Sequence, residues 1–310
     1  MSKPTVLRIG GSTTANTGEA AGAGLVARPT TFGADVWRRF RRNRLALVGL
    51  AIVVGLIGLA VLAPLVAPYD PLHVSLNEQF APPSAQHLFG ADVYGRDLLS
   101  RVIFGARISL LIGFIPSAIS MLIGSALGVI AGFYRRWTDT LVMRLADMVL
   151  AFPSIILAMV VTYILGASLF TLFIALSVVS WASASRVVRA QALSLRERDF
   201  VAAARAVGAS DIRIMFRHII PNCLAPILVL FTMSIPAAIM AEAGLSFLGV
   251  GAQPPTPSWG LMVNEAQQYI FSAPWASIMP GLAILVTVLG FNFVGDGLRD
   301  AIDPYLKGKM

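Results

Sequence analysis

Long, mainly apolar runs alternate with polar intervals along most of the chain, a pattern that predicts membrane-spanning helices. An apolar run of about 20 residues can cross the hydrocarbon layer of a bilayer as an α-helix. We therefore predict an all-α integral membrane protein with six transmembrane helices. The expected spans are 45–67, 108–133, 141–165, 168–183, 223–243 and 278–293.

The polar interval at 186–222 predicts two short helices joined by a hinge. Asp199 is placed to cap the first helix, and Gly208 stands where a helix end favours a left-handed residue. Ser210 then begins the second helix, which Pro221 is expected to end. The apolar face of the first helix needs a partner, and it consists of Phe200, Val201, Ala204 and Val207.

One interpretation of this interval is an amphipathic loop on the lipid surface, because its polar side is rich in arginine. Its spacing resembles E-A-A-x3-G-x9-I-x-L-P, the loop by which permease subunits of ABC importers dock onto their ATPases. Ala202 stands where that motif has Glu, and His218 stands where it has Ile. The matching residues are Ala202, Ala203, Ala204, Gly208, Ile220 and Pro221.

Two further stretches resemble the C-type permeases of peptide and nickel ABC importers. Residues 87–101 are similar to the segment before the second span of these proteins. Residues 242–260, which read G-L-S-F-L-G-x-G-x-Q-P-P-x-P-S-W-G from the third residue on, are similar to their external loop. The resemblance covers roughly 38–303 and implies the type I ABC importer permease fold, with 186–222 as a cytoplasmic coupling loop.

Charged residues within or near the spans are expected to pair locally. Asp97 and Arg101 are four residues apart on an expected interfacial helix. A carboxylate metal loop is a competing interpretation of residues 90–97, although their spacing is not that of an EF-hand. In the third span, Arg144 and Asp147 are three residues apart and are expected to pair with each other.

A small residue recurs every four positions in the second span, which predicts a groove for close packing against another helix. The four residues of this groove are Ser120, Gly124, Gly128 and Gly132. Prolines inside the spans are expected to kink the helices. They include Pro116, Pro153, Pro226 and Pro236.

Composition supports the membrane assignment. Of 310 residues, 56% are apolar and only 13% are charged, and the mean hydropathy is +0.76, which excludes a soluble fold. The net charge of +8 comes from arginines beside the spans, so nucleic acid is not an expected partner. Twenty of the 24 Lys and Arg residues fall on one side of the predicted membrane, which places both termini in the cytoplasm. The single cysteine, Cys223, excludes an internal disulfide.

These patterns divide the chain into four parts. Residues 1–36 are expected to be a disordered cytoplasmic tail, and 301–310 a second cytoplasmic tail. Between them, 37–107 contains an arginine cluster, the first span and an external interfacial segment, and 108–300 is the permease core with five spans. A cleavable signal peptide is the competing interpretation of the first span, but its apolar core would be only about 7–15 residues long.

The sequence lacks the residues that ATP hydrolysis needs. The only Gly-Lys pair is Gly308-Lys309, and Asp303 stands where a phosphate-binding loop would have its first glycine. The histidines also lie in loops, so an intramembrane hydrolase is not predicted. We expect no catalytic residue, metal or cofactor in this chain, with ATP and magnesium bound by partner subunits.

The resemblance implies a homologous second permease of the B type, two cytoplasmic ATPases, an external substrate-binding protein and membrane lipid as partners. The expected function is to form half of the pathway for di- or oligopeptides across the bacterial cytoplasmic membrane. Import of nickel or another small solute is an alternative. An ion-coupled secondary transporter is another, but Asp147 and Glu242, the carboxylates it would need at mid-membrane, lie near span ends.

Overall fold

The computed structural model describes residues 32–302, and within this range the chain is built from helices and loops. Short 3₁₀ turns lie at Leu76–Glu78 and Gln267–Tyr269, and a π-helical turn lies at Met215–Ile219. The α-helices are α1 (Phe32–Phe40), α2 (Arg44–Val61), α3 (Ala63–Val66), α4 (Leu98–Tyr134), α5 (Arg136–Leu150), α6 (Ser154–Leu165), α7 (Leu169–Arg196), α8 (Asp199–Ala206), α9 (Asp211–Ile214), α10 (Ile220–Phe247), α11 (Trp259–Ala266) and α12 (Trp275–Ile302).

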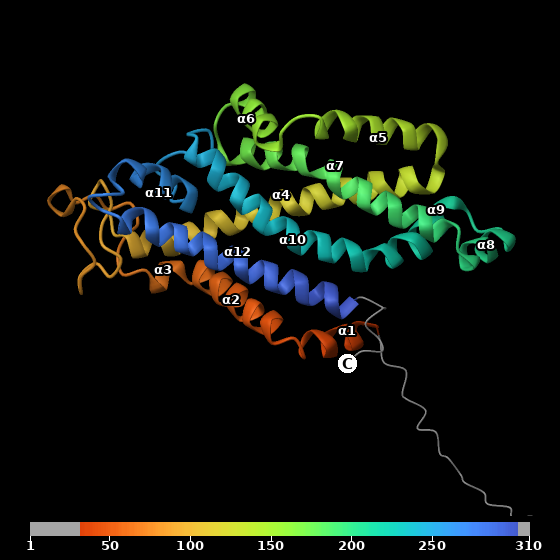
Figure 1. Cartoon of the computed structure of the whole chain (residues 1–310), viewed down its shortest axis with the longest axis horizontal. Helices are drawn as coiled ribbons and strands as arrows, with labels where there is room; N and C mark the ends of the chain where they lie inside the picture. Colours follow the sequence, from red (N-terminus) through yellow and green to blue (C-terminus); the bar gives the residue numbers. More distant parts are fainter. Residues whose placement is uncertain (1–31, 303–310) are drawn as a thin grey trace, which may run out of the picture.

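The long helices lie side by side and alternate in direction (Figure 1). The helices α8 and α9 lie at one end of the molecule, where α1 begins the described chain, and α11 lies at the opposite end (Figure 1). Five helical segments are long and apolar enough to cross a membrane, and α5 with α6 makes a sixth, broken span. The predicted all-α fold with six spans is therefore confirmed.

The third span is not the continuous helix that the sequence predicted. α5 and α6 are bent by 89° at the short break between them. Pro153 precedes α6, and a proline both lacks a backbone N–H group and disfavours helical geometry in the residue before it. The other three prolines named above lie inside α4 and α10, which continue through them.

Several predicted boundaries also shift. Residues 32–36 belong to α1, whereas the rest of the predicted N-terminal tail, together with 303–310, lies outside the described residues. The helix expected from Asp97 onward does form, but as the first turns of α4 rather than as a separate interfacial helix, and 87–97 forms a loop. Asp97 caps α4, since its carboxylate accepts a hydrogen bond from the backbone N–H of Ser100 at 2.7 Å.

α4 packs closely against α7 along the predicted groove of small residues. A Cβ atom built on Gly124 would lie 2.7 Å from the carbonyl oxygen of Trp181, and one built on Gly128 would lie 2.6 Å from that of Ser185. Gly132 approaches the carbonyl oxygen of Arg189 in the same way, at 2.6 Å. A helix of this chain thus fills the groove, and the absence of side chains permits backbone-to-backbone contact.

We expect Gly128→Leu to destabilise the chain itself. Extra volume in a packed interior typically costs about 1–3 kcal/mol, and here the new side chain meets a helix backbone that cannot rotate away. Gly55→Leu is the matched control, because a Cβ atom at Gly55 on α2 has open space around it. The measurement is the unfolding temperature of the purified chain in detergent. Equal unfolding temperatures for both variants would contradict the close packing of α4 and α7.

Candidate functional site

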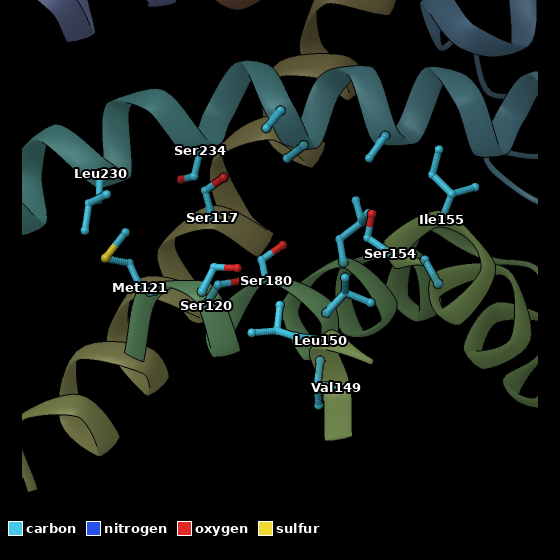
Figure 2. A pocket seen from close by; sticks show the side chains of 18 of the residues that line it. Ser117, Ser120, Met121, Val149, Leu150, Ser154, Ile155, Ser180, Leu230 and Ser234 are labelled. Atoms are coloured by element: carbon cyan, nitrogen blue, oxygen red, sulfur yellow. The ribbon is translucent and has the colours of Figure 1, made fainter. Parts of the chain in front are cut away.

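A cavity of about 370 Å³ lies between α4, α7, α10 and the break between α5 and α6. Its wall combines apolar side chains with six serines (Figure 2). Of the serines, only Ser120 was expected from the sequence to have a role, in helix packing. The serines are Ser117, Ser120, Ser154, Ser180, Ser183 and Ser234.

Two of these serine hydroxyls are engaged with their own helices. Ser120 Oγ donates to the carbonyl oxygen of Pro116 at 2.6 Å, and Ser234 Oγ donates to that of Phe231 at 2.8 Å. The Ser117 side chain differs, because the residue is only 2% exposed and its hydroxyl finds no hydrogen-bond partner among the described residues. The cavity therefore contains a buried polar group whose hydrogen bonds are unmade.

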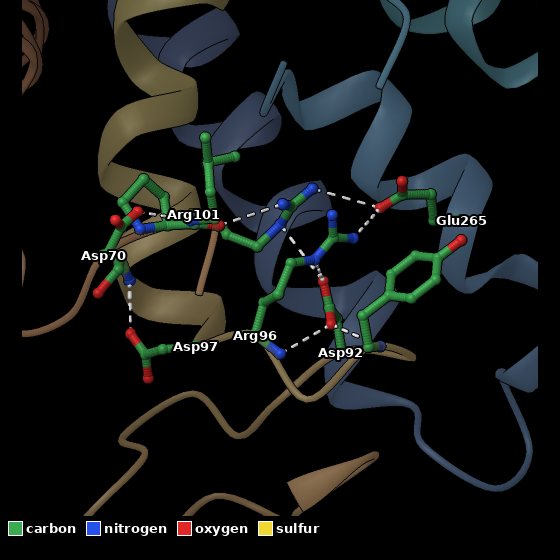
Figure 3. Close-up of polar contacts among 10 residues, drawn as sticks. Asp70, Asp92, Arg96, Asp97, Arg101 and Glu265 are labelled. Carbon is green, nitrogen blue, oxygen red and sulfur yellow. Dashed lines mark hydrogen bonds and ion pairs between the residues drawn. The ribbon is translucent and has the colours of Figure 1, made fainter. Parts of the chain in front are cut away.

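At the end of the molecule that holds α11, buried charges join the loop before α4 to α11 (Figure 3). Arg96 Nε lies 2.6 Å from Asp92 Oδ2, and its Nη2 lies 2.7 Å from Glu265 Oε2. Arg101, which is fully buried, contacts the same two carboxylates at 3.4 and 3.3 Å. We call these four residues the loop–α11 ion network.

The predicted pair between Asp97 and Arg101 is therefore wrong. Asp97 caps α4 and lies 2.9 Å from His87 Nδ1, whereas Arg101 turns toward Asp92 and Glu265. The competing metal-loop interpretation also lacks a site, since no three His, Cys, Asp or Glu side chains gather as metal ligands within 32–302.

A second set of ion pairs connects α5 to α7. Arg186 Nη2 lies 2.5 Å from Asp147 Oδ1, and Arg189 pairs with Asp139. The expected pair between Arg144 and Asp147 is therefore wrong. Spacing along one helix allowed that pair, but α7 runs beside α5 and presents a closer guanidinium to Asp147.

The two helices of the 186–222 interval form as predicted, but their limits differ. Gly208 has a φ of +80°, and Ser210 Oγ accepts a hydrogen bond from the backbone N–H of Arg213 at 3.4 Å. Asp199 is not the cap, because it is the first residue of α8 and Arg198 precedes it without a side-chain hydrogen bond. Pro221 does not end the second helix, since α9 continues through the π-helical turn into α10.

The π-helical turn explains how a proline is accommodated there. In this turn the backbone N–H of Ile220 donates to the carbonyl oxygen of Met215, five residues back. Pro221 follows within the first turn of α10 and has no backbone N–H group that would need a hydrogen-bond acceptor. The wider turn thus absorbs the proline without ending the helix.

The predicted apolar face of α8 divides into buried and exposed parts. Val201 and Ala204 are buried in a cluster that includes Val129 and Phe133 at the end of α4 and Val188 of α7. They hold α8 against its own chain and are not free to contact a partner. Ala202, Ala203 and Gly208 are exposed, as is Pro221, whereas Ile220 is partly buried.

Three large apolar side chains of the same loop are exposed. Val207 is 85% exposed, Ile212 is 64% exposed and Phe216 is 67% exposed. We call these three residues the loop-tip patch. Spacing placed Val207 on an apolar face but could not separate it from Val201 and Ala204, because burial within the chain decides which apolar residues remain exposed.

We expect the loop–α11 ion network to stabilise the fold strongly. Glu265→Gln leaves Arg96 and Arg101 to share the single carboxylate of Asp92, and breaking a buried pair in this way typically costs about 3–5 kcal/mol. Glu197→Gln is the control, because Glu197 pairs with Arg135 in an exposed position, where such pairs contribute about 0–1 kcal/mol.

The unfolding temperature of the purified protein distinguishes the two variants. A marked fall for Glu265→Gln with little change for Glu197→Gln is the expected result. An equal, small effect of both substitutions would contradict a stabilising role for the network.

These features define a class of protein. Several membrane spans, a cavity among them and a helical loop with an exposed apolar tip are the parts of a transport permease. Comparison with known families agrees: residues 124–308 match the binding-protein-dependent transport system inner membrane component, and residues 31–83 match the N-terminal transmembrane domain of oligopeptide transport permease C. The chain belongs to the binding-protein-dependent transport permeases, a family of transport proteins rather than enzymes, and the predicted assignment to ABC importer permeases is confirmed.

Similar proteins cover most of the chain. It is 45% identical over 273 residues to the dipeptide transport system permease protein DppC of Alkalihalophilus pseudofirmus, with 88% of this chain and 90% of the relative aligned. It is 47% identical over 270 residues to a putative peptide transport system permease protein of Brucella abortus, covering 87% and 91%. It is also 46% identical over 278 residues to the glutathione transport system permease protein GsiD of Escherichia coli O6:K15:H31, covering 88% and 91%.

Proposed function

We propose that this chain is the membrane subunit of an ATP-driven importer of peptides and forms half of the pathway through the membrane. Its family consists of inner membrane components of binding-protein-dependent transport systems. The relatives named above are called dipeptide, peptide and glutathione permeases, which favours a peptide as substrate over the nickel alternative. A homologous second permease of the B type supplies the other half of the pathway.

The loop-tip patch is the observation that best supports coupling to an ATPase. Exposed apolar side chains that lie close to a glycine hinge along the chain fit a docking surface for a protein partner. Two cytoplasmic ATPase subunits, which bind the ATP and magnesium, are the proposed partners at this end. An external substrate-binding protein is the proposed partner at the opposite end.

The distribution of arginines supports the orientation. The arginines before α2, those between α4 and α5 and those of the loop all belong to the end of the molecule that holds α8 and α9 (Figure 1). Positively charged segments of membrane proteins remain on the cytoplasmic side. We therefore place this end, with both termini, in the cytoplasm of a bacterium.

Gly208→Val tests the proposed coupling. At a φ of +80° a β-branched residue is strained by about 1–3 kcal/mol, which would tilt α8 relative to α9, although no neighbouring atom is displaced. Gly208→Asn is the matched control, because Asn tolerates the left-handed conformation. We expect normal amounts of both variants in the membrane.

The readouts are peptide uptake and ATP turnover stimulated by the loaded binding protein, in vesicles with the full complex. Gly208→Val should lose most of both activities, and Gly208→Asn should keep them. Wild-type uptake by Gly208→Val would show that the loop does not transmit the ATPase movement.

A further inference from the structure

The serine-lined cavity offers polar groups but no charged side chain. All of its lining residues are serines or apolar residues, and they come from five helices, α4, α5, α6, α7 and α10, and from the break before α6. Its volume of about 370 Å³ lies within the range of roughly 300–1,000 Å³ that is usual for small-molecule pockets. A ligand of this cavity must therefore be recognised through hydrogen bonds and apolar contact rather than through ion pairs.

The break in the third span places the first turn of α6 in the cavity wall. Ser154 and Ile155, in the first turn of α6, line it, and Pro153 provides no side-chain cap for this turn. The first N–H groups of a helix lack partners within the helix and give its N-terminus a partial positive charge. This end of the cavity favours an oxygen acceptor.

Ser117 independently indicates a ligand. Its hydroxyl is buried on α4 without a partner among the described residues, and its side chain lies among those that line the cavity (Figure 2). Leaving a buried polar group unpaired costs about 1–3 kcal/mol. A group that enters the cavity and forms a hydrogen bond with Ser117 would recover this free energy.

We propose that this cavity binds the amide backbone of a peptide in transit, an inference that rests on the proposed function. A peptide amide presents one donor and one acceptor, and serine hydroxyls can match both. A carbonyl oxygen of the peptide would accept a hydrogen bond from Ser117. The N–H group would donate to the free lone pairs of Ser120 and Ser234, whose hydroxyl protons are already engaged.

This arrangement gives recognition that does not depend on the peptide's side chains. The apolar part of the wall accepts uncharged side chains, and no basic or acidic residue selects for charge. The binding unit is the amide, so a peptide amide and the corresponding free peptide should occupy the cavity equally well.

A cysteine placed in the cavity tests the proposal. The native Cys223 is fully buried, so a charged thiol reagent reports on an introduced cysteine. Ser180→Cys lies on the cavity wall, whereas Leu122→Cys, the control, lies on the outer surface of α4. In vesicles with the full complex, Ser180→Cys should react about tenfold faster than Leu122→Cys, because only a wetted thiol forms the reactive thiolate.

Occupancy is then measured as protection from the reagent. Trialanine and trialanine amide should slow the labelling of Ser180→Cys to the same degree. Adding Ser117→Ala should raise the trialanine concentration needed for half protection several-fold. Adding Ser177→Ala instead should leave the trialanine concentration for half protection unchanged. Ser177 is buried on α7 outside the cavity lining, and its hydroxyl donates to the Phe173 carbonyl.

Three results would overturn the proposal while leaving the proposed function intact, provided that wild-type vesicles take up trialanine. In the first, Ser180→Cys is labelled as slowly as Leu122→Cys. In the second, trialanine does not slow the labelling of Ser180→Cys. In the third, trialanine protects Ser180→Cys but trialanine amide does not. The absence of trialanine uptake by the wild-type complex would instead overturn the proposed function and, with it, this inference.

Discussion

The close approach of α4 and α7 is the contact on which the rest of the structure depends. Between two helices in lipid, apolar side chains gain little by leaving the hydrocarbon, so close backbone packing must hold them together. Three glycines spaced by four residues provide that packing over about two helical turns. The same two helices line the central cavity, and their far ends hold Val201 and Ala204 of α8. A movement of α8 would therefore reach the cavity through a rigid pair of helices.

The two ends of the molecule hold their charges differently. In the loop–α11 ion network the paired side chains are almost fully buried, and each carboxylate contacts two arginines. The pairs of Arg186 with Asp147 and of Arg135 with Glu197 are about half exposed, where an ion pair contributes little. The end that holds α11 is thus held by buried charges, whereas these two exposed pairs at the opposite end can rearrange at low cost.

Features determined by local chemistry could be predicted from the sequence. The apolar runs specify the spans, the four-residue repeat of Gly124, Gly128 and Gly132 specifies a packing groove, and Gly208 and Ser210 specify the hinge and the next helix start. Each depends on residues that are neighbours along one helix or turn.

Features that depend on distant partners could not be predicted in this way. Arg101 pairs with Asp92 and Glu265 because a loop folds back beside α11, and Asp147 pairs with Arg186 because α5 lies along α7. Spacing along one helix suggested other pairs. Pro221 was expected to end a helix, but the π-helical turn before it lets the helix continue. The cavity was missed for the same reason, since its serines come from four helices.

The proposed contact between the loop-tip patch and an ATPase links the loop to transport. The most direct test attaches a photoactivatable maleimide to Val207→Cys in the full complex, with Leu76→Cys, exposed at the opposite end, as the control. We predict that illumination crosslinks the Val207→Cys variant to an ATPase subunit and that the Leu76→Cys variant forms no crosslink to that subunit. Crosslinking of Val207→Cys to lipid alone would contradict the account and make the loop a membrane-surface helix.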